Sequence, residues 1–572
     1  MLSLVSALLL GFYFVVAKAA PEVIDSTQNI SYVGFTRNGC DSFLNIPYGQ
    51  DTGRNRFGPP QKFVPANGAV YNNTIAGKSC PQRTGGSSSY MTTLQASDIS
   101  EDCLNLLVVR PEGIAPGTKL PVMVQVYIYG GGLFTGTAYQ RVQTGEGLVS
   151  ESVKNGLPVI YVAMNYRLNI FGFALSESLR GEKSLNVGLR DQRLALDWVQ
   201  EKIGHFGGDK DRVTIFGQSS GALSVTMQIT AYGGTQKAPF QKAIIESTAL
   251  EATQTSNLTL FTFNTVAQWT GCENGTDPQS ASTLACLRGL SMESLLNTTL
   301  AQQDSTASDN DGDTYLPTID GDFIPEAPSA LIAAGKFNQI PFIAGWTKDD
   351  AAPFTKTSIQ TANDTLAFIS NIYTALTPAT LTALLDLYPV TDFTANPTAG
   401  LSAEFYRSAQ IFRDILLTCP NFLLGAAMTK KFKSSSTGKT TAPVYLFMQN
   451  QTIITPSAGA HAGLGIVHTS DLPYVFGQFG DYNTSATSVY PTASDYKLHE
   501  RQSRSWSTFA YTGSPSLEGK RTLEGWTGSY DTWTGDVEGV RGVKVYSIGG
   551  ENAGLSGIDA GAIAGQKLAK RY

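Results

Sequence analysis

The chain has 572 residues, enough for one very large α/β domain or for several domains of average size. Hydrophobic residues make up 42% of it, so a sizeable core can form, whereas charged residues make up only 15% and give a net charge of −6. This balance indicates neither a basic face for nucleic acids nor a patch that binds anionic membranes.

The first segment of the chain is typical of a secretion signal. Leu2–Val16 is almost wholly apolar, and the small-x-small site Ala17–Ala19 follows it, so residues 1–20 are predicted to be a signal peptide. The alternative is an N-terminal membrane anchor, since no Lys or Arg precedes the apolar run, but about 15 apolar residues are few for a span. The polar end Lys567–Tyr572 lacks the hydrophobic tail of a lipid-anchor signal. We therefore expect a secreted, extracellular protein without a stable membrane anchor.

The N-terminal half of the chain alternates between strand-like and helix-like segments. Strands are expected over Pro121–Tyr129, Leu157–Tyr166, Val213–Phe216 and Lys242–Glu246, and helices over Gly188–Ile203 and Leu223–Ile229. Such alternation predicts an α/β fold with a large, mostly parallel central sheet flanked by helices. Ligands of such sheets bind at the carboxyl ends of the strands.

The C-terminal half has longer helical patterns, and polar stretches separate them. Helices are expected over Thr377–Leu387, where Pro378 follows a cap-like threonine, and over Ser408–Leu417. The surface loops or tails are expected at Gln302–Asp313, Lys430–Thr441 and Gly549–Gly565. None of these is a convincing interdomain linker, so residues 21–572 are predicted to form a single domain with extensive insertions.

Cysteines and glycosylation sequons fit the secreted interpretation. Six cysteines in a secreted chain are expected to form disulfides: Cys40, Cys80, Cys103, Cys272, Cys286 and Cys419. The chain has no CxxC pair and no cluster of histidines, so no metal site is expected. Some of the eight Asn-x-Ser/Thr sequons are expected to carry glycans: Asn29, Asn72, Asn257, Asn274, Asn297, Asn363, Asn450 and Asn483.

The segment Val213–Ala222 carries the clearest chemical signal. An apolar strand ends in Gly217-Gln218-Ser219-Ser220-Gly221, and a helical run follows, which is the pattern of a nucleophile elbow. Side chains two residues either side of the serine would collide in so sharp a turn, so glycine is needed there. The alternative is an ordinary Gly/Ser turn. We expect Ser219 to be a nucleophile.

The glycines that follow the expected strand at Pro121–Tyr129 could bind an oxyanion. Tandem glycines at Gly130, Gly131 and Gly132 let backbone N–H groups approach a substrate oxygen closely. The alternative is a flexible glycine loop.

A serine nucleophile also needs a histidine base, and the chain has only four histidines. His205 precedes the serine and is expected to be structural, and His499 lies in a charged stretch and is expected to be solvated. His461 and His468 both follow the serine, as the chain order of such hydrolases requires. On order alone these two are nearly equal candidates.

The third member of a triad is a carboxylate that orients the imidazole. Asp349 and Asp350 follow the strand-like run Phe342–Gly345, so they are good candidates. Many other acidic residues lie in the same interval, and chemistry alone does not choose among them.

Further motifs stand in order along the chain. They are Phe43–Gly49, Arg56–Phe57, Ser100–Leu104, Asn165–Arg167 and Phe206–Asp209. Together with Gly130–Gly132 and Gly217–Ala222, they resemble the type-B carboxylesterase/lipase family, which includes cholinesterases and fungal lipases. The resemblance runs from about Val23 to about Gly513. It implies an α/β-hydrolase fold and hydrolysis of carboxylic esters without a cofactor.

The resemblance implies a role for each matching position. Ser219 matches the nucleophile and His468 the base, because the family histidine stands three residues before the acid of its Glu/Asp-Ile/Leu-Pro-Tyr run, as His468 does before Asp471. Asp350 falls where the family usually has Glu, so the backbone must compensate for one missing methylene. Gly131, Gly132 and the N–H of Ser220 match the oxyanion donors. Ser247 matches a serine that steadies the acid. The pairs Cys80–Cys103 and Cys272–Cys286 match two family disulfides. Cys40 and Cys419 remain and are expected to pair.

Three departures from the family pattern bear on activity and substrate. Gln218 replaces the usual Glu, which removes a charge near the imidazole, and Ser220 replaces the usual Ala, which the backbone N–H tolerates. The Cys80–Cys103 loop is short, polar and lacks Trp, unlike a lipase lid or a choline site. We therefore expect an esterase for small to medium-sized esters. A triacylglycerol lipase or sterol esterase is the alternative, and a non-catalytic, cholinesterase-like binding protein is a weaker one.

Overall fold

The computed structural model describes residues 19–85, 92–124, 130–250, 257–273, 275, 277–306, 314–434, 443–454, 462–483, 488–535, 541–550 and 553–557. Nearly all of the predicted signal peptide, with His461 and the sequon at Asn274, lies outside these residues.

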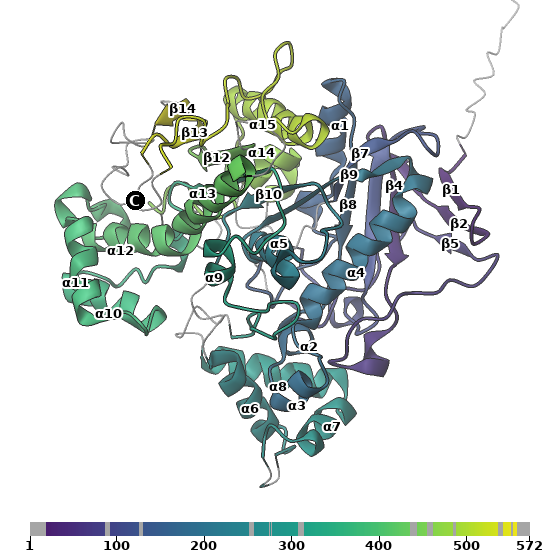
Figure 1. The fold of residues 1–572 in the computed structure, drawn as a ribbon, viewed down its shortest axis with the longest axis horizontal. Coiled ribbons are helices and arrows are strands. Elements are labelled where there is room, and N and C mark those ends of the chain that lie inside the picture. The colour runs from purple at the N-terminus through teal and green to yellow at the C-terminus, as the bar shows by residue number, and fades with distance from the viewer. Residues whose placement is uncertain are drawn as a thin grey trace, which may run out of the picture.

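A large mixed sheet forms the centre of the molecule (Figure 1). Within the described residues it has eleven strands, in the spatial order β14 (Gly554–Gly557), β13 (Lys544–Ile548), β12 (Val444–Gln449), β11 (Phe342–Thr347), β10 (Lys242–Glu246), β9 (Gly208–Gln218), β7 (Leu120–Val124), β8 (Ile160–Met164), β6 (Asn105–Pro111), β4 (Cys40–Pro47) and β3 (Phe35–Arg37). The strands from β8 to β13 are parallel, and both ends of the sheet are antiparallel. A small second sheet joins β1 (Glu22–Asp25), β2 (Ile30–Val33) and β5 (Val70–Asn72).

The parallel strands are apolar because helices cover both faces of the sheet. All residues of β11 and β12 are buried, and so is the second half of β9. Sheets covered on both faces require such continuous apolar runs. The prediction of a mostly parallel central sheet is therefore confirmed, and its carboxyl edge brings the ends of β9, β10 and β11 side by side.

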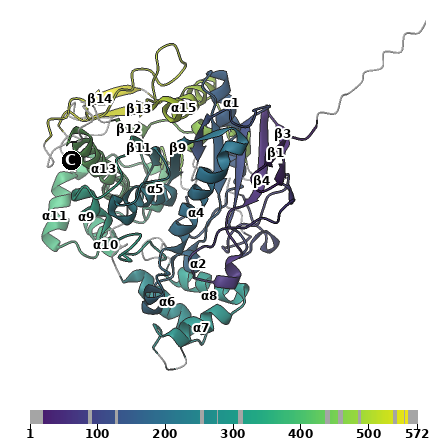
Figure 2. The same ribbon diagram turned by 45° about the vertical axis from the view of Figure 1, so that its right-hand side comes forward.

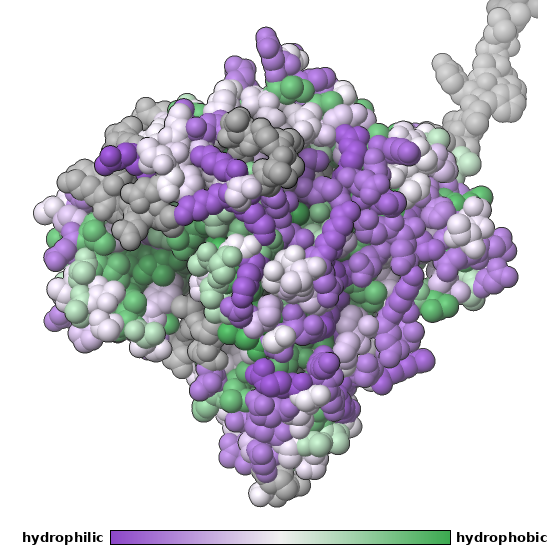
Figure 3. Space-filling view, viewed as in Figure 1, coloured by the Kyte–Doolittle hydropathy of each residue, from purple (hydrophilic) through white to green (hydrophobic). Residues whose placement is uncertain are grey.

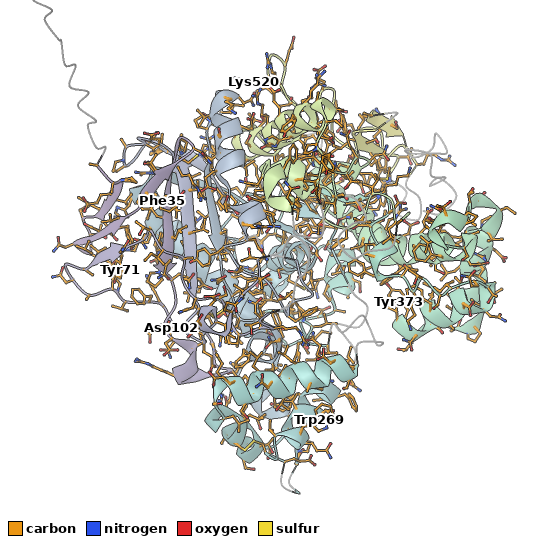
Figure 4. The ribbon with its side chains drawn as sticks, turned by 180° about the vertical axis from the view of Figure 1, so that it is seen from behind. Phe35, Tyr71, Asp102, Trp269, Tyr373 and Lys520 are labelled. Atoms are coloured by element: carbon orange, nitrogen blue, oxygen red, sulfur yellow. A yellow bond between two sulfur atoms is a disulfide. The ribbon has the colours of Figure 1, made fainter. Side chains whose placement is uncertain are left out.

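Helices surround the sheet and also form two lobes beyond it (Figures 1 and 2). The helices near the sheet are α1 (Glu146–Lys154), α2 (Asn169–Phe173), α3 (Glu177–Gly181), α4 (Val187–Lys202), α5 (Ser220–Thr230), α9 (Pro328–Ala333), α13 (Cys419–Ser434), α14 (Leu472–Phe476) and α15 (Ala493–Thr512). One lobe contains α6 (Leu258–Trp269), α7 (Ala281–Gly289) and α8 (Met292–Ser305), and the other contains α10 (Ala362–Ile372), α11 (Pro378–Leu387) and α12 (Ala403–Arg413). Figure 4 marks the two lobes by Trp269 and Tyr373.

The helical lobes are insertions that follow strands of the sheet. Residues 257–305 come after β10, and residues 362–434 come between β11 and β12. Thr377 caps α11 by accepting from the N–H of Thr380 at 3.2 Å, as its position before Pro378 predicts. Both lobes therefore begin at the carboxyl edge of the sheet.

Helices α12 and α13 form one continuous helical segment. A π-helical turn at Asp414–Thr418 joins them, and such turns are frequent at functional sites. The segment Ala403–Ser434 has the length and the hydropathy, 1.3, of a membrane span, but 67% of that window is buried inside the fold. It therefore packs as a core helix of the fold.

Two expected disulfides form, and the third does not. Cys80 pairs with Cys103 and Cys272 pairs with Cys286. Cys40 and Cys419 are free thiols, so the expectation that they pair is wrong. Cys40 lies on β4 near one end of the sheet, whereas Cys419 begins α13, which packs beside β12 near the other end (Figure 1). Pairing by elimination ignored this separation.

Several element boundaries also differ from expectation. The stretch after Gln302 continues α8 to Ser305, and the stretch after Lys430 continues α13 to Ser434. Part of the expected C-terminal tail forms β14, which pairs antiparallel with β13. Sheet pairing at the edge thus overrides a Gly- and Ser-rich composition that favours a loop.

Candidate active site

Ser219 stands at the sharp turn between β9 and α5. Its backbone has φ 58° and ψ −129°, a conformation that non-glycine residues rarely adopt. A Cβ atom on Gly217 would lie 2.5 Å from the carbonyl carbon and oxygen of Gly221, so the turn leaves no room for a side chain there. The backbone has the shape of a nucleophile elbow.

The glycine loop lies directly against Ser219. A Cβ atom on Gly130 would be 2.8 Å from the Cβ of Ser219, and Leu133 N–H donates to the Ser220 hydroxyl at 3.3 Å. Gly131 has φ +133° and Gly132 has φ +56°, which glycine adopts readily. The loop and the first turn of α5 together can hold a negatively charged oxygen with backbone N–H groups.

The structure brings Asp350 and His468 together. Asp350 Oδ1 lies 2.5 Å from His468 Nδ1. Its other oxygen, Oδ2, accepts from the Ser247 hydroxyl at 2.7 Å and from Thr347 N–H at 2.9 Å. Asp350 is fully buried, while the His468 side chain is 10% exposed. Every carboxylate oxygen of Asp350 therefore has a partner, and the imidazole is oriented with Nδ1 toward it.

The second ring nitrogen of His468 faces the amide of Gln218. Gln218 Nε2 lies 3.0 Å from His468 Nε2. Because Nδ1 faces a carboxylate, the proton of the neutral ring belongs on Nδ1, and the Gln218 amide donates to Nε2. In the described part of the chain no hydrogen bond joins His468 to the Ser219 hydroxyl, and contacts of this kind often tighten only when substrate binds.

The other histidines have different surroundings. His205 Nε2 lies 3.2 Å from Asp25 Oδ1, in agreement with a structural role. His499 is not solvated as expected: it packs on Phe479, meets the backbone carbonyl of Tyr474 at 3.0 Å, and burial lowers its pKa. The charged residues of this stretch, Lys497, Glu500, Arg501 and Arg504, recur at helical spacing and share one face of α15, whereas His499 lies on another face.

Two buried carboxyl groups near the site were not recognised from the sequence. Glu246 ends β10 and is paired directly with Gln218 on the adjacent strand β9, and Asp471 follows His468 by three residues. Both are 0% exposed. The burial of Glu246 could have been predicted from its place at the end of an apolar strand beside Ser247, because a carboxyl group there must be buried.

The described residues show how exposed the sequon asparagines are and whether side chains gather as they would around a metal ion. Exposed sequon asparagines are Asn29, Asn72, Asn257, Asn297, Asn363 and Asn483, and Asn450 is half-buried. Within the described residues, no group of three His, Cys, Asp or Glu side chains is arranged to hold a metal ion.

Comparisons with known proteins identify the family of the chain. The model of the carboxylesterase family matches residues 30–534. A secreted lipase of Arthroderma benhamiae is 44% identical over 97% of this chain and 94% of its own. An inactive carboxylesterase-like protein of Byssochlamys spectabilis is 37% identical over 90% of this chain and 87% of its own. The crystal structure of Aspergillus niger EstA is 25% identical, covers 94% of this chain and 95% of its own, and has a TM-score of 0.75.

The family match covers most of the chain, and the structural match extends over the α/β-hydrolase sheet and its lobes. The elbow, the glycine loop and the Asp350–His468 pair fall within the matched residues. The chain belongs to the carboxylesterase family and is a carboxylic-ester hydrolase.

Proposed function

We propose that this protein is a secreted serine esterase in which Ser219, His468 and Asp350 form the catalytic triad. The observation that carries the proposal is the 2.5 Å contact between Asp350 Oδ1 and His468 Nδ1 at the same edge of the sheet as the Ser219 elbow. The strained backbone of Ser219 supports it, because such strain clusters at functional sites. Relatives named as secreted lipases support the extracellular location.

The proposed reaction has two steps. His468 Nε2 takes the proton of the Ser219 hydroxyl as the serine oxygen attacks the ester carbonyl, and the N–H groups of Gly131, Gly132 and Ser220 hold the oxyanion. His468 then gives its proton to the leaving alcohol. In the second step water attacks the acyl-enzyme, with His468 again as base, and releases the acid. Asp350 orients the ring and stabilises its charged form.

The substrate is proposed to be apolar on the side that faces α10–α12. The ring of Phe354 contacts the ring of His468, with centroids 5.2 Å apart. From Phe354 a separate apolar cluster continues into this lobe, with half-buried members Ile372, Leu376, Leu381, Leu384, Leu385, Phe393, Ile415 and Leu416. Figure 3 shows hydrophobic residues gathered in a hollow beside α12. Partly buried apolar side chains in a cluster that begins at Phe354, against His468, fit an apolar chain of the ester.

Two substrate classes follow from these features. The short, polar Cys80–Cys103 loop favours soluble esters of small to medium size. The apolar cluster beside Phe354 favours a second candidate, a triacylglycerol lipase or sterol esterase. The two differ in how their rate depends on acyl length and on an oil–water interface.

The test is a profile of kcat/KM against acyl length for p-nitrophenyl esters, with emulsified triacylglycerol measured separately. A maximum at short and medium chains without emulsion activity supports the first class, and a rise toward long chains with emulsion activity supports the second. Ser219→Ala serves as control. Ester turnover that survives Ser219→Ala would overturn the proposed function itself.

A further inference from the structure

A group of buried polar side chains lies near His468. Gln218 and Glu246 are neighbours across β9 and β10, where they are directly paired in register. Glu246 Oε1 accepts from the indole N–H of Trp506 on α15 at 2.7 Å, and the Glu246 backbone carbonyl accepts from Ser219 N–H at 2.9 Å. Asp471 reaches the same region from the loop that carries His468. Glu246 thus touches the elbow itself, and Asp471 shares a loop with the base.

Four oxygen atoms of this group accept no hydrogen bond of good geometry within the described residues, although the backbone N–H groups of Asp471 and Leu472 lie near the Asp471 carboxyl group. They are Gln218 Oε1, Glu246 Oε2, and both Oδ1 and Oδ2 of Asp471. All three side chains are 0% exposed. A buried carboxylate oxygen without a partner is costly, and a proton on the carboxyl group removes most of that cost. The arrangement therefore favours protonated acids.

The electrostatic surroundings point the same way. Burial, with the charge of Asp471, raises the pKa of Glu246 well above its usual range. Burial, with the charge of Asp350, raises the pKa of Asp471 to about 7, while nearby backbone N–H groups and His468 act in the opposite direction. The ionisable groups that act on Asp471 are thus Asp350, His468 and Glu246. Of the two buried acids, Asp471 is the one that ionises at accessible pH.

We propose that Asp471, beside a protonated Glu246, is a positioning residue that adds a second negative charge near the Asp350–His468 pair when it loses its proton. The inference rests on the proposed function, since it acts through His468. Below neutral pH, Asp471 is a neutral acid and Asp350 alone stabilises the charged imidazole. Above neutral pH, the proton of Asp471 passes to solvent, and its carboxylate also favours the imidazolium that forms when Ser219 attacks.

The expected result is a rate that keeps rising above neutral pH. A second carboxylate close to a buried imidazolium raises kcat by roughly three- to tenfold between pH 6 and pH 8.5. Asp471→Asn keeps the shape of the side chain but cannot ionise, so its kcat stays at the lower level of the wild type across that range. This change in pH profile is not expected from a merely structural role.

Infrared difference spectroscopy provides a second readout that does not depend on activity. A protonated carboxyl C=O band that disappears as pH rises through neutrality, and that is absent from Asp471→Asn, is expected. A second band that persists through the same range and is lost in Glu246→Gln is also expected. Asp495→Asn is the matched control, because Asp495 is a buried acid of α15 that bonds to Tyr474 and Thr492.

The outcomes separate the two proposals. A phosphonate label on Ser219, measured in parallel, reports whether the triad is correct. If Ser219 labels normally but Asp471→Asn keeps the second rise, or if no carboxyl band titrates near neutral pH, the inference about Asp471 is overturned while the proposed function stands. If Ser219 does not label, the proposed function fails first.

Discussion

The amide nitrogen of Gln218 lies 3.0 Å from Nε2 of His468. This is the ring nitrogen that we propose accepts the serine proton. The family pattern that the sequence resembles has Glu at this position. A neutral N–H donor stabilises the uncharged imidazole, whereas a carboxylate stabilises the charged one. We therefore expect the charge of the residue before the nucleophile to affect catalysis.

Gln218→Glu is expected to move the acidic limb of the kcat/KM profile to higher pH, by about one unit. The introduced carboxylate favours the protonated ring, so a higher pH is needed to free Nε2. A pH–rate profile with a soluble p-nitrophenyl ester measures the shift. Gln200→Glu, which adds the same charge on α4 away from the site, should leave the limb in place. An unmoved limb in Gln218→Glu would show that the contact does not tune the base.

Asp350→Asn is expected to lower kcat by about 10³-fold or more, because an amide cannot stabilise the imidazolium and favours the wrong tautomer. Asp350→Glu should also lower kcat, although the family usually has Glu, because both oxygens of Asp350 are already satisfied within a fully buried site. Ser247→Ala, which removes one of these bonds, should cost about tenfold. Steady-state kinetics on one ester compares all three, and an Asp350→Glu variant faster than wild type would contradict this account.

Gly217→Ala is expected to destabilise the protein by about 2 kcal/mol or more and to distort the elbow, because the new Cβ would meet the Gly221 carbonyl at 2.5 Å. Gly289→Ala in α7 is the matched control, since nothing lies within 4 Å of its Cβ position, and alanine should be neutral or slightly stabilising there. Thermal unfolding measures both variants. Equal melting temperatures would refute the steric argument.

Two thiols per molecule are expected to react with iodoacetamide in denaturant without reductant, and none rapidly in the native protein. Burial raises the pKa of both Cys40 and Cys419 to about 12, so neither is an appreciable thiolate at pH 8. Mass spectrometry of the alkylated protein counts them. A mass that corresponds to three disulfides would contradict the free thiols.

The local sequence was sufficient to predict those features that depend only on neighbouring residues. The elbow at Ser219 needs glycines two residues away on either side, so its pattern is readable without knowledge of the fold. The strand Lys242–Glu246 has the bounds expected from its apolar run, because a buried parallel strand must be apolar throughout.

Long-range proximity was the part that sequence could not supply. His461 and His468 are equivalent by order, and the family pattern was needed to choose between them. Cys40 and Cys419 share a residue type but lie near opposite ends of the sheet. The burial of Glu246 with Asp471 depends on how β10, the His468 loop and α15 pack, which no local pattern encodes.

The most direct test of the catalytic proposal is labelling with a fluorophosphonate, followed by peptide mass mapping of the folded, secreted protein. The expected result is one phosphonyl group per molecule on the peptide that contains Ser219, with slow labelling in His468→Ala and none in Ser219→Ala. An unlabelled Ser219 peptide in protein that hydrolyses esters, or label on another serine, would contradict the triad.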